Sequence, residues 1–208
     1  MRKTKLKLHK NLSVDMAGLC DIAFLMLVFF ISVSHFEQWE PLKIETPTTK
    51  EPNVCTAFRR YDYGIIYIAE NKVMFQFVNC DSARKVTLSA MAQKYGVRFS
   101  NDETIKFLES PIIGAPIGSL KIYDNQYDEW DASVDRPGIP YTGNNSELYN
   151  WILEARKADA AVNGRALLIT IKADKHVSYP IIRQVIDILQ KQKVNRFGLV
   201  TDSQSTAI

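Results

Sequence analysis

The sequence predicts an α+β protein in which one N-terminal transmembrane helix precedes an exported mixed β-sheet domain with helices packed on one face. Three observations predict it. The chain has one apolar stretch of membrane length, at residues 17–36. Two apolar runs separated by a short polar turn lie between residues 64 and 78. Patterns typical of strand, helix and strand then follow one another between residues 166 and 201.

The apolar stretch contains a carboxylate, Asp21. The run after Asp21 is too short to span a bilayer alone, because Ser32, Ser34 and His35 interrupt it. Extending the helix back to Ala17 gives a spanning length of roughly 20 residues and places Asp21 about one turn inside the membrane. A carboxylate at that depth is costly, so by default it marks an ion path, a proton path or the site of a partner charge.

Two other interpretations of this segment compete. In the first, it is a cleaved signal peptide with a basic start, an apolar region at Ile22–Val33 and a cleavage site at Ser32–Ser34. Its length, and the presence of Asp15 and Asp21 before the apolar region, argue against cleavage. In the second, Asp21 only starts the helix at the membrane interface, which the spanning length argues against. We therefore expect a retained anchor.

Charge gives the expected orientation. Basic residues, and no acidic one, precede Leu12, and basic tails stay in the cytoplasm. We expect residues 1–16 to be a cytoplasmic tail, residues 17–36 the transmembrane helix, and the remainder exported. The net charge of +3 comes mostly from the tail, so the sequence carries no nucleic-acid footprint.

A polar linker at residues 37–62 follows the helix, with prolines that favour extended chain. Within it, Leu42, Lys43, Ile44 and Glu45 alternate apolar and charged side chains, which predicts a short strand. The globular domain is expected at residues 63–202, with a short tail at 203–208. It starts with a β-hairpin that turns between Ala69 and Lys72.

The cysteine and histidine residues predict no metal site and leave one disulfide possible. Cys20 lies in the apolar helix, where it is expected to pack. Cys55 and Cys80 are both in the exported part, so a disulfide between them is possible, although nothing in the sequence fixes their separation. The three histidines are isolated, and no Cys/His spacing predicts a metal site. We expect no metal and no cofactor.

The region around residues 80–145 has the weakest pattern. Short helices are expected at Val86–Tyr95 and Glu103–Leu108, and Asp124–Asn145 is rich in turn residues and predicts a long loop. Aromatic residues in and beside this loop either line a partner surface or hold the loop on the domain, and the second interpretation is preferred. They are Tyr123, Tyr127, Trp130 and Tyr141.

A clear secondary-structure pattern begins again at Ser146, which is expected to start a helix that ends at Asn163–Gly164. A buried strand follows at Ala166–Ile171. Ser178 and Pro180 then begin a second helix, and Phe197–Thr201 is a last strand. This βαβ order predicts parallel strands and a right-handed crossover.

Together these residues resemble the ExbD/TolR family. The resemblance lies first in the membrane segment, where Val14–Asp21 is followed by the Leu/Phe-rich run Phe24–Phe30. It continues in Leu42–Pro47, similar to the strand after the membrane helix, and in the C-terminal run Leu168–Asp202. Gly18 stands where the family usually has proline. The chain is also longer than typical members, and the excess falls at residues 80–145, which are expected to be an insert.

The resemblance implies an inner-membrane subunit of a proton-driven motor. Such subunits pair as a homodimer inside a multi-helix partner of the ExbB/TolQ type, and they drive a TonB- or TolA-like protein that reaches the outer membrane. The exported domain would then be periplasmic. Asp21 is expected to be the proton-relay residue, and Leu42–Glu45 is expected to pair with the sheet edge of the other protomer.

On an ideal helix, a set of residues around Asp21 shares one face, which we expect to face the pore. Desolvation favours the neutral carboxyl and a hydrated surface favours the carboxylate, so a moving helix would bind and release a proton. A lone helix forms no proton path by itself, so a partner is required. The other residues of this face are Val14, Gly18, Leu25, Val28 and Ser32.

Three competing functions are weaker. A passive single-pass anchor or binding protein explains the topology but not Asp21. A sensor subunit needs a larger cytoplasmic domain. An enzyme is least favoured, since no nucleophile, base or metal constellation stands out, and Asp174 after a strand is expected to serve a turn or a cap.

Overall fold

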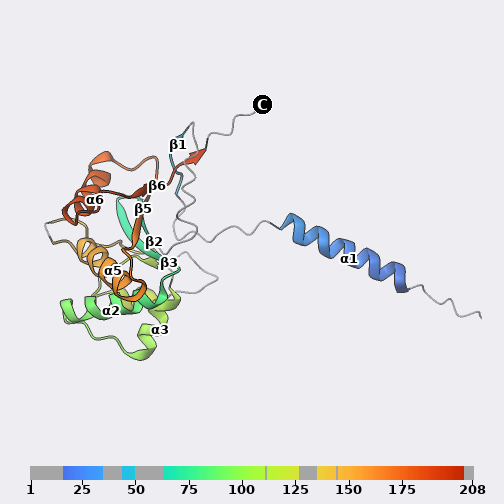
Figure 1. Cartoon of the computed structure of the whole chain (residues 1–208), viewed down its shortest axis with the longest axis horizontal. Helices are drawn as coiled ribbons and strands as arrows, with labels where there is room; N and C mark the ends of the chain where they lie inside the picture. Colours follow the sequence, from blue (N-terminus) through green and yellow to red (C-terminus); the bar gives the residue numbers. More distant parts are fainter. Residues whose placement is uncertain are drawn as a thin grey trace, which may run out of the picture. The chain divides into compact units, whose positions relative to one another are not determined.

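The computed structural model describes residues 16–34, 44–49, 63–110, 112–126, 135–143 and 145–203. The chain divides into two compact units, Met1–Trp39 and Glu40–Ile208 (Figure 1). The first unit holds α1, Met16–Val33. The last turn of this helix continues to Ser34, whose N–H donates to the carbonyl of Phe30 at 2.9 Å. Among the described residues, no helix combines the length and the apolar character needed to cross a membrane.

The second unit is built on a five-stranded mixed sheet with the order β4-β3-β2-β5-β6. β2 (Tyr63–Ala69) and β3 (Lys72–Val78) form the predicted antiparallel hairpin. Both turn residues, Glu70 and Asn71, have positive φ, which gives the turn a twist that matches that of the strands. The hairpin prediction is confirmed.

The C-terminal strands join this hairpin in parallel. β5 (Leu168–Ala173) pairs with β2 on one side and with β6 (Gly198–Leu199) on the other. The register along β2 runs from Tyr63 opposite Leu168 to Ile68 opposite Ala173. The predicted parallel pairing of the last two strands is confirmed, and the structure adds that β2 is their neighbour.

Helices cover one face of the sheet (Figure 1). They are α2 (Asp81–Tyr95), α5 (Glu147–Asn163) and α6 (Tyr179–Lys191). α5 begins and ends as predicted: Ser146 Oγ accepts the N–H of Tyr149 at 3.3 Å, and Gly164 caps the C-terminus with a left-handed backbone that suits glycine. Pro180 lies in the first turn of α6, as expected.

The main core lies between this sheet face and the helices. Successive residues of a strand point to opposite faces. Ile66 and Ile68 are fully buried in the main core, whereas Ile65 and Tyr67 face the other side and belong to a smaller apolar cluster. The largest fully buried side chains include Trp151, Phe75, Phe107, Met91, Leu120 and Leu148.

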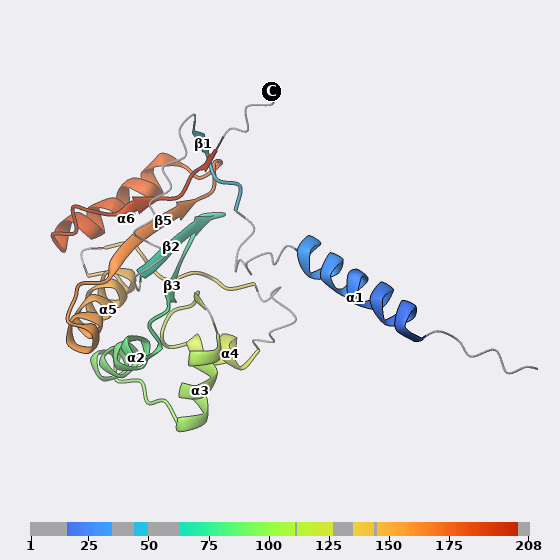
Figure 2. The ribbon, with the colours of Figure 1, turned by 45° about the vertical axis from the view of Figure 1, so that its right-hand side comes forward.

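The middle of the chain is more ordered than the sequence predicts. α3 (Asn101–Glu109) begins before the expected residue 103, because Ser100 and Glu103 form a capping box. Two elements were missing from the sequence prediction, β4 (Ile112–Ile113) and α4 (Leu120–Asn125), and both are too short to give a periodic signal. The views of Figures 1 and 2 show α3 at the end of the unit where α2 lies.

The described residues of the expected loop after Asn125, which are 126, 135–143 and 145, belong to no helix or strand. Tyr123 and Tyr141 are partly buried against the main core, which agrees with a role in holding the loop on the domain. Tyr127 and Trp130 lie outside the described residues.

The strand predicted at Leu42–Glu45 is expected to pair with the sheet edge of another protomer, and that pairing stays a prediction. Leu42 and Lys43 lie outside the described residues, and Ile44 and Glu45 belong to no strand. The reason is that backbone groups of Glu45 bond to a turn of the same chain. A shorter strand, β1 (Thr48–Thr49), follows and pairs in parallel with β7 (Asp202–Ser203). We call residues 44–49 the strap.

Candidate functional site

The predicted proton-relay face lies on α1. Gly18, Asp21, Leu25, Val28 and Ser32 are all in this helix, at steps of three and four residues, so their backbones share one side. The first predicted member of the face, Val14, lies outside the described residues. A Cβ added to Gly18 would meet no atom within 4 Å, so packing within the chain does not require glycine there.

Large apolar side chains surround Asp21 on every side of α1. Each is at least 47 % exposed. A helix that is apolar all round is buried in a protein core or in a membrane. The exposed side chains are Leu19, Ile22, Phe24, Leu25, Met26, Leu27, Val28, Phe29, Phe30, Ile31 and Val33.

The strap is held by the turn after β5. The N–H of Glu45 donates to Oδ2 of Asp174 at 3.0 Å, and the N–H of Lys175 donates to the carbonyl of Glu45 at 2.8 Å. The side chains of Lys175 and Glu45 form an ion pair. Thr46 is buried, and Ile44 packs on the small cluster of Tyr67, Met74 and Ile112.

Asp174 has the turn role that the sequence predicts, and a second one that it does not. Its Oδ1 accepts the N–H of His176 at 2.8 Å, which closes the turn, while its Oδ2 holds the strap. These two N–H donors lower the pKa of Asp174. The ion pair lowers the pKa of Glu45 and raises the pKa of Lys175, so the contact is charged at neutral pH.

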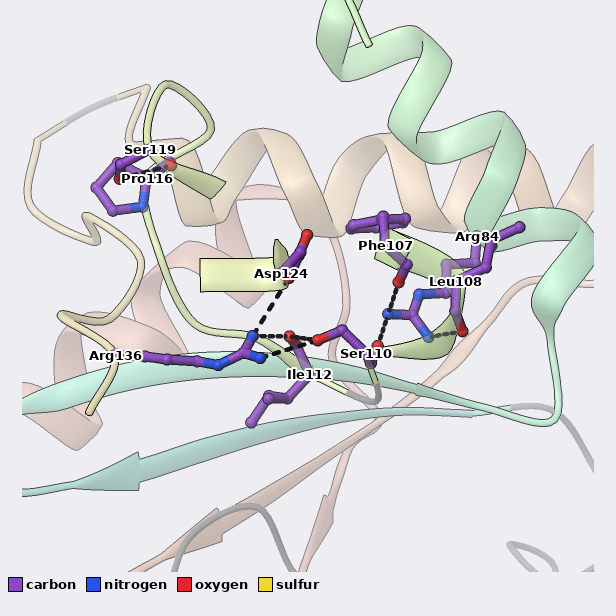
Figure 3. A network of polar contacts seen from close by, with 9 residues as sticks. All are labelled: Arg84, Phe107, Leu108, Ser110, Ile112, Pro116, Ser119, Asp124 and Arg136. Atoms are coloured by element: carbon purple, nitrogen blue, oxygen red, sulfur yellow. Dashed lines mark hydrogen bonds and ion pairs between the residues drawn. The ribbon is translucent and has the colours of Figure 1, made fainter. Parts of the chain in front are cut away.

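A buried polar network joins the middle elements to the sheet (Figure 3). Arg84 of α2 donates to the carbonyls of Phe107, Leu108 and Ser110, at the end of α3. Its guanidinium also lies 4.6 Å from the ring centre of Phe107. Burial lowers the pKa of Arg84 to about 10, so it stays charged at neutral pH. Arg84 thereby satisfies the carbonyls at the C-terminus of α3.

Arg136 is the second cation of this network. Its guanidinium donates to the carbonyl of Ile112 in β4 at 2.6 Å and to Oγ of Ser110 at 3.0 Å. It also forms an ion pair with Asp124 of α4, at 3.5 Å from Nη1 to Oδ1. Burial raises the pKa of Asp124 to about 6, and the attraction of Arg136 offsets this only in part.

A groove of about 710 Å³ lies along the end of the sheet beside β6. Its lining is mostly apolar side chains of β2, β5 and the chain around β6, and among the described lining residues Arg196 is the one cation and none is acidic. The groove residues Leu199, Val200 and Thr201 come directly before β7, which carries the strap. The groove and the strap site are therefore continuous along the chain.

The remaining predicted site residues give no cluster. Cys80 is buried, but Cys55 lies outside the described residues, so their disulfide stays a prediction. The described residues contain no group of three or more His, Cys, Asp or Glu side chains that could hold a metal ion. The strap contact and the network of Arg84, Asp124 and Arg136 were not predicted, because each joins residues far apart in the sequence.

Comparison with known proteins bears on the N-terminal part of the chain. A family model described as biopolymer transport protein ExbD/TolR matches residues 8–108. The match contains α1, the strap, the hairpin, α2 and most of α3, and it continues into residues 80–108 of the expected insert. No curated protein and no solved structure matches the chain. The resemblance of the C-terminal run lies outside the matched residues and rests on the sequence motifs alone.

The matched range begins in the basic tail and includes Asp21 with the whole of α1, which is the segment that carries the resemblance. Members of this family are transport proteins associated with the inner membrane, and their role in biopolymer transport is energy coupling rather than enzymatic turnover. The resemblance drawn from the sequence is confirmed for residues 8–108, which match the ExbD/TolR family model.

Proposed function

We propose that the chain is the proton-carrying subunit of an inner-membrane motor, and that Asp21 is its proton-relay residue. The observation that carries the proposal is a single carboxylate on a helix whose other large side chains are apolar and exposed on every side. In a helix covered by lipid or by partner helices, such a group is costly as an anion and titrates when its surroundings change.

The membrane topology is part of the proposal. Residues 17–36 would give about 30 Å of helix, which is the thickness of the hydrocarbon core. The basic residues before Leu12 would keep the N-terminus in the cytoplasm, so the unit Glu40–Ile208 would be periplasmic.

The proton cycle follows from the environment of the carboxyl group. Facing an apolar surface, Asp21 would be neutral, and facing a polar or hydrated surface of a partner, it would release its proton. One charge that crosses the membrane gains about 2.3 kcal/mol per 100 mV, so a few protons supply useful work. Gly18 lies one turn before Asp21 and leaves room for a partner helix or water beside the carboxyl group.

The partners follow from the family. A multi-helix ExbB/TolQ-like protein would supply the other half of the proton path, because one helix cannot enclose it. A TonB- or TolA-like protein would receive the work, and two copies of the chain would place two α1 helices side by side. Exchange of Leu42–Glu45 between protomers would require the strap to leave its own domain first, since Glu45 is bonded within the chain.

The test is the change Asp21→Asn in the chain co-expressed with its membrane partner. The amide keeps size and polarity but does not titrate, so proton flux into energised vesicles should fall at least tenfold while co-purification of the partner is unchanged. Asp187→Asn, the same chemical change on the exposed surface of α6, is the matched control and should leave flux unaltered. Full flux in the Asp21→Asn chain would instead support a passive anchor.

A further inference from the structure

The strap occupies a surface that accepts extended polypeptide. Two polar contacts with the turn after β5 use backbone groups: the N–H of Glu45 donates to Asp174, and the carbonyl of Glu45 accepts the N–H of Lys175. β1 then adds to β7 as a parallel strand, with Thr48 opposite Asp202. Backbone bonds of this kind are available to any extended segment, which is the basis of strand addition in recognition.

Two features of the surface select a sequence. Lys175 pairs with a carboxylate at the position of Glu45, and the next residue, Thr46, is 5 % exposed, so its site takes a small β-branched side chain with a hydroxyl group. The strap itself thus displays the preferred chemistry, which is an acidic residue followed by a hydroxyl residue.

The surface continues beyond the strap. The lining of the groove beside β6 includes Thr201, which directly precedes β7, and the described part of this lining is mostly apolar, with the cation Arg196 and no acidic residue. A segment longer than the strap could therefore lie over β7 and extend into the groove. Lys175 would meet an acidic group at the position of Glu45 and Arg196 one in the groove, while the carboxylate of Asp174 already accepts two backbone N–H groups, so charge favours acidic side chains at these two positions.

The contacts that hold the strap can break without unfolding the domain. The ion pair has 46 % and 64 % exposed side chains, and exposed pairs contribute little and are screened by salt. The paired strand has two residues on each side. Segments held by few buried contacts open locally at low cost.

We propose that Asp174, Lys175 and β7 form a docking site for an extended segment of a partner protein in which an acidic residue is followed by a hydroxyl residue, and that the strap occupies this site in cis. The strap is then an internal competitor, and a partner segment binds in proportion to the fraction of chains whose strap is open. Because the strap leads toward α1, occupation of the site by a partner would free residues of the linker. The inference does not depend on the role of Asp21.

The experiment uses the full chain in detergent and a fluorescent peptide with the sequence of residues 42–49 as probe. Glu45→Lys opposes Lys175 and should open the strap, so the variant should bind the peptide at least tenfold more tightly than the unchanged chain. Lys175→Glu should also open the strap, but it reverses the charge of the site. It should prefer a second peptide that carries lysine at the position of Glu45.

Circular dichroism and thermal unfolding check that both variants remain folded. The proposal is overturned if Glu45→Lys and the unchanged chain bind the probe equally, or if neither variant distinguishes the two peptides. It is also overturned if Glu45→Lys becomes a dimer in sedimentation and ignores the peptide, since the surface would then serve a second copy of the chain. Tighter binding by Glu45→Lys together with inverted preference in Lys175→Glu supports it.

Discussion

Segments from distant parts of the chain bond at β4, an edge of the five-stranded sheet, and at β7, outside that sheet, and the two contacts have different chemistry. At β4, the guanidinium of Arg136 is 5 % exposed and donates to Ile112, while the N–H of Gly138 donates to Gly114 at 2.7 Å. At β7, the strap is held by an exposed ion pair and a two-residue strand, and its buried contacts are those of Thr46 and Ile44. The contact at β4 is expected to stay closed, whereas the contact at β7 can open and release the strap.

The difference follows from the cost of breaking each contact. Removing Arg136 leaves the buried carbonyl of Ile112 without its donor and the buried carboxyl group of Asp124 without its ion-pair partner, and buried groups that lose a charged partner cost several kcal/mol. Opening the strap returns Glu45 and Lys175 to water, which solvates both. Three changes test this comparison.

The largest effect is expected for Arg136→Leu. It should lower the free energy of unfolding by about 3 to 5 kcal/mol, because Asp124 stays buried without its nearest cation. Urea unfolding followed by circular dichroism measures it. The double change Arg136→Leu with Asp124→Leu removes both charges and should recover a large part of the loss. If the single change lowered the free energy of unfolding by less than about 1 kcal/mol, Arg136 would not be what stabilises the contact at β4.

A smaller effect, with a defined pH dependence, is expected for Asp124. Its pKa rises from 3.8 to about 6 on folding, with burial as the main cause, so the folded state holds the proton more tightly than the unfolded state. The group therefore stabilises the fold most below about pH 4, and this contribution is lost as the pH rises through about 6. Its size is on the order of 1 to 3 kcal/mol.

Asp124→Asn should remove this dependence. The difference in unfolding free energy between the unchanged chain and Asp124→Asn, measured at several values between pH 4 and pH 7.5, should favour the unchanged chain increasingly as the pH falls. A difference that stays constant across this range would mean that Asp124 does not titrate in the folded state.

The same comparison explains which features the sequence predicts. Ser146 and Gly164 act on their own helix, and the hairpin turn acts on its own strands, so these elements can be predicted from neighbouring residues. The partner of β2 is β5, about one hundred residues later, and no local pattern encodes that register. Nothing in the sequence distinguishes Arg84, Asp124 and Arg136 from charged residues of the surface, although all three are buried.

The strap shows that an alternating pattern does not identify the neighbour to which a segment bonds. Leu42–Glu45 has the period of a strand, but a strand needs a neighbour, and the neighbour available to Glu45 is a turn rather than a sheet edge. Thr48 and Thr49, which follow Glu45 closely in the sequence, pair with β7 instead. For Asp21 the reverse holds: the sequence singles it out, because a carboxylate in an apolar run is visible without any tertiary contact.

The smallest effect on stability, and the one that bears most on exchange, is expected for Glu45→Gln. The change removes the ion pair with Lys175 but keeps the backbone bonds, so thermal unfolding should be unaltered within error while the amide of Lys175 exchanges several-fold faster with deuterium. Glu70→Gln, in the exposed β2–β3 turn, is the control and should leave that amide unchanged.

In the unchanged chain, added salt should speed the same exchange, since screening weakens an exposed pair. Because Lys175 holds the pKa of Glu45 below its ordinary value, protection should persist under mild acid and be lost only when the pH falls through that lowered pKa. If Glu45→Gln instead lowered the thermal unfolding temperature as Arg136→Leu does, the strap would be as permanent as the contact at β4, and the contrast between them would fail.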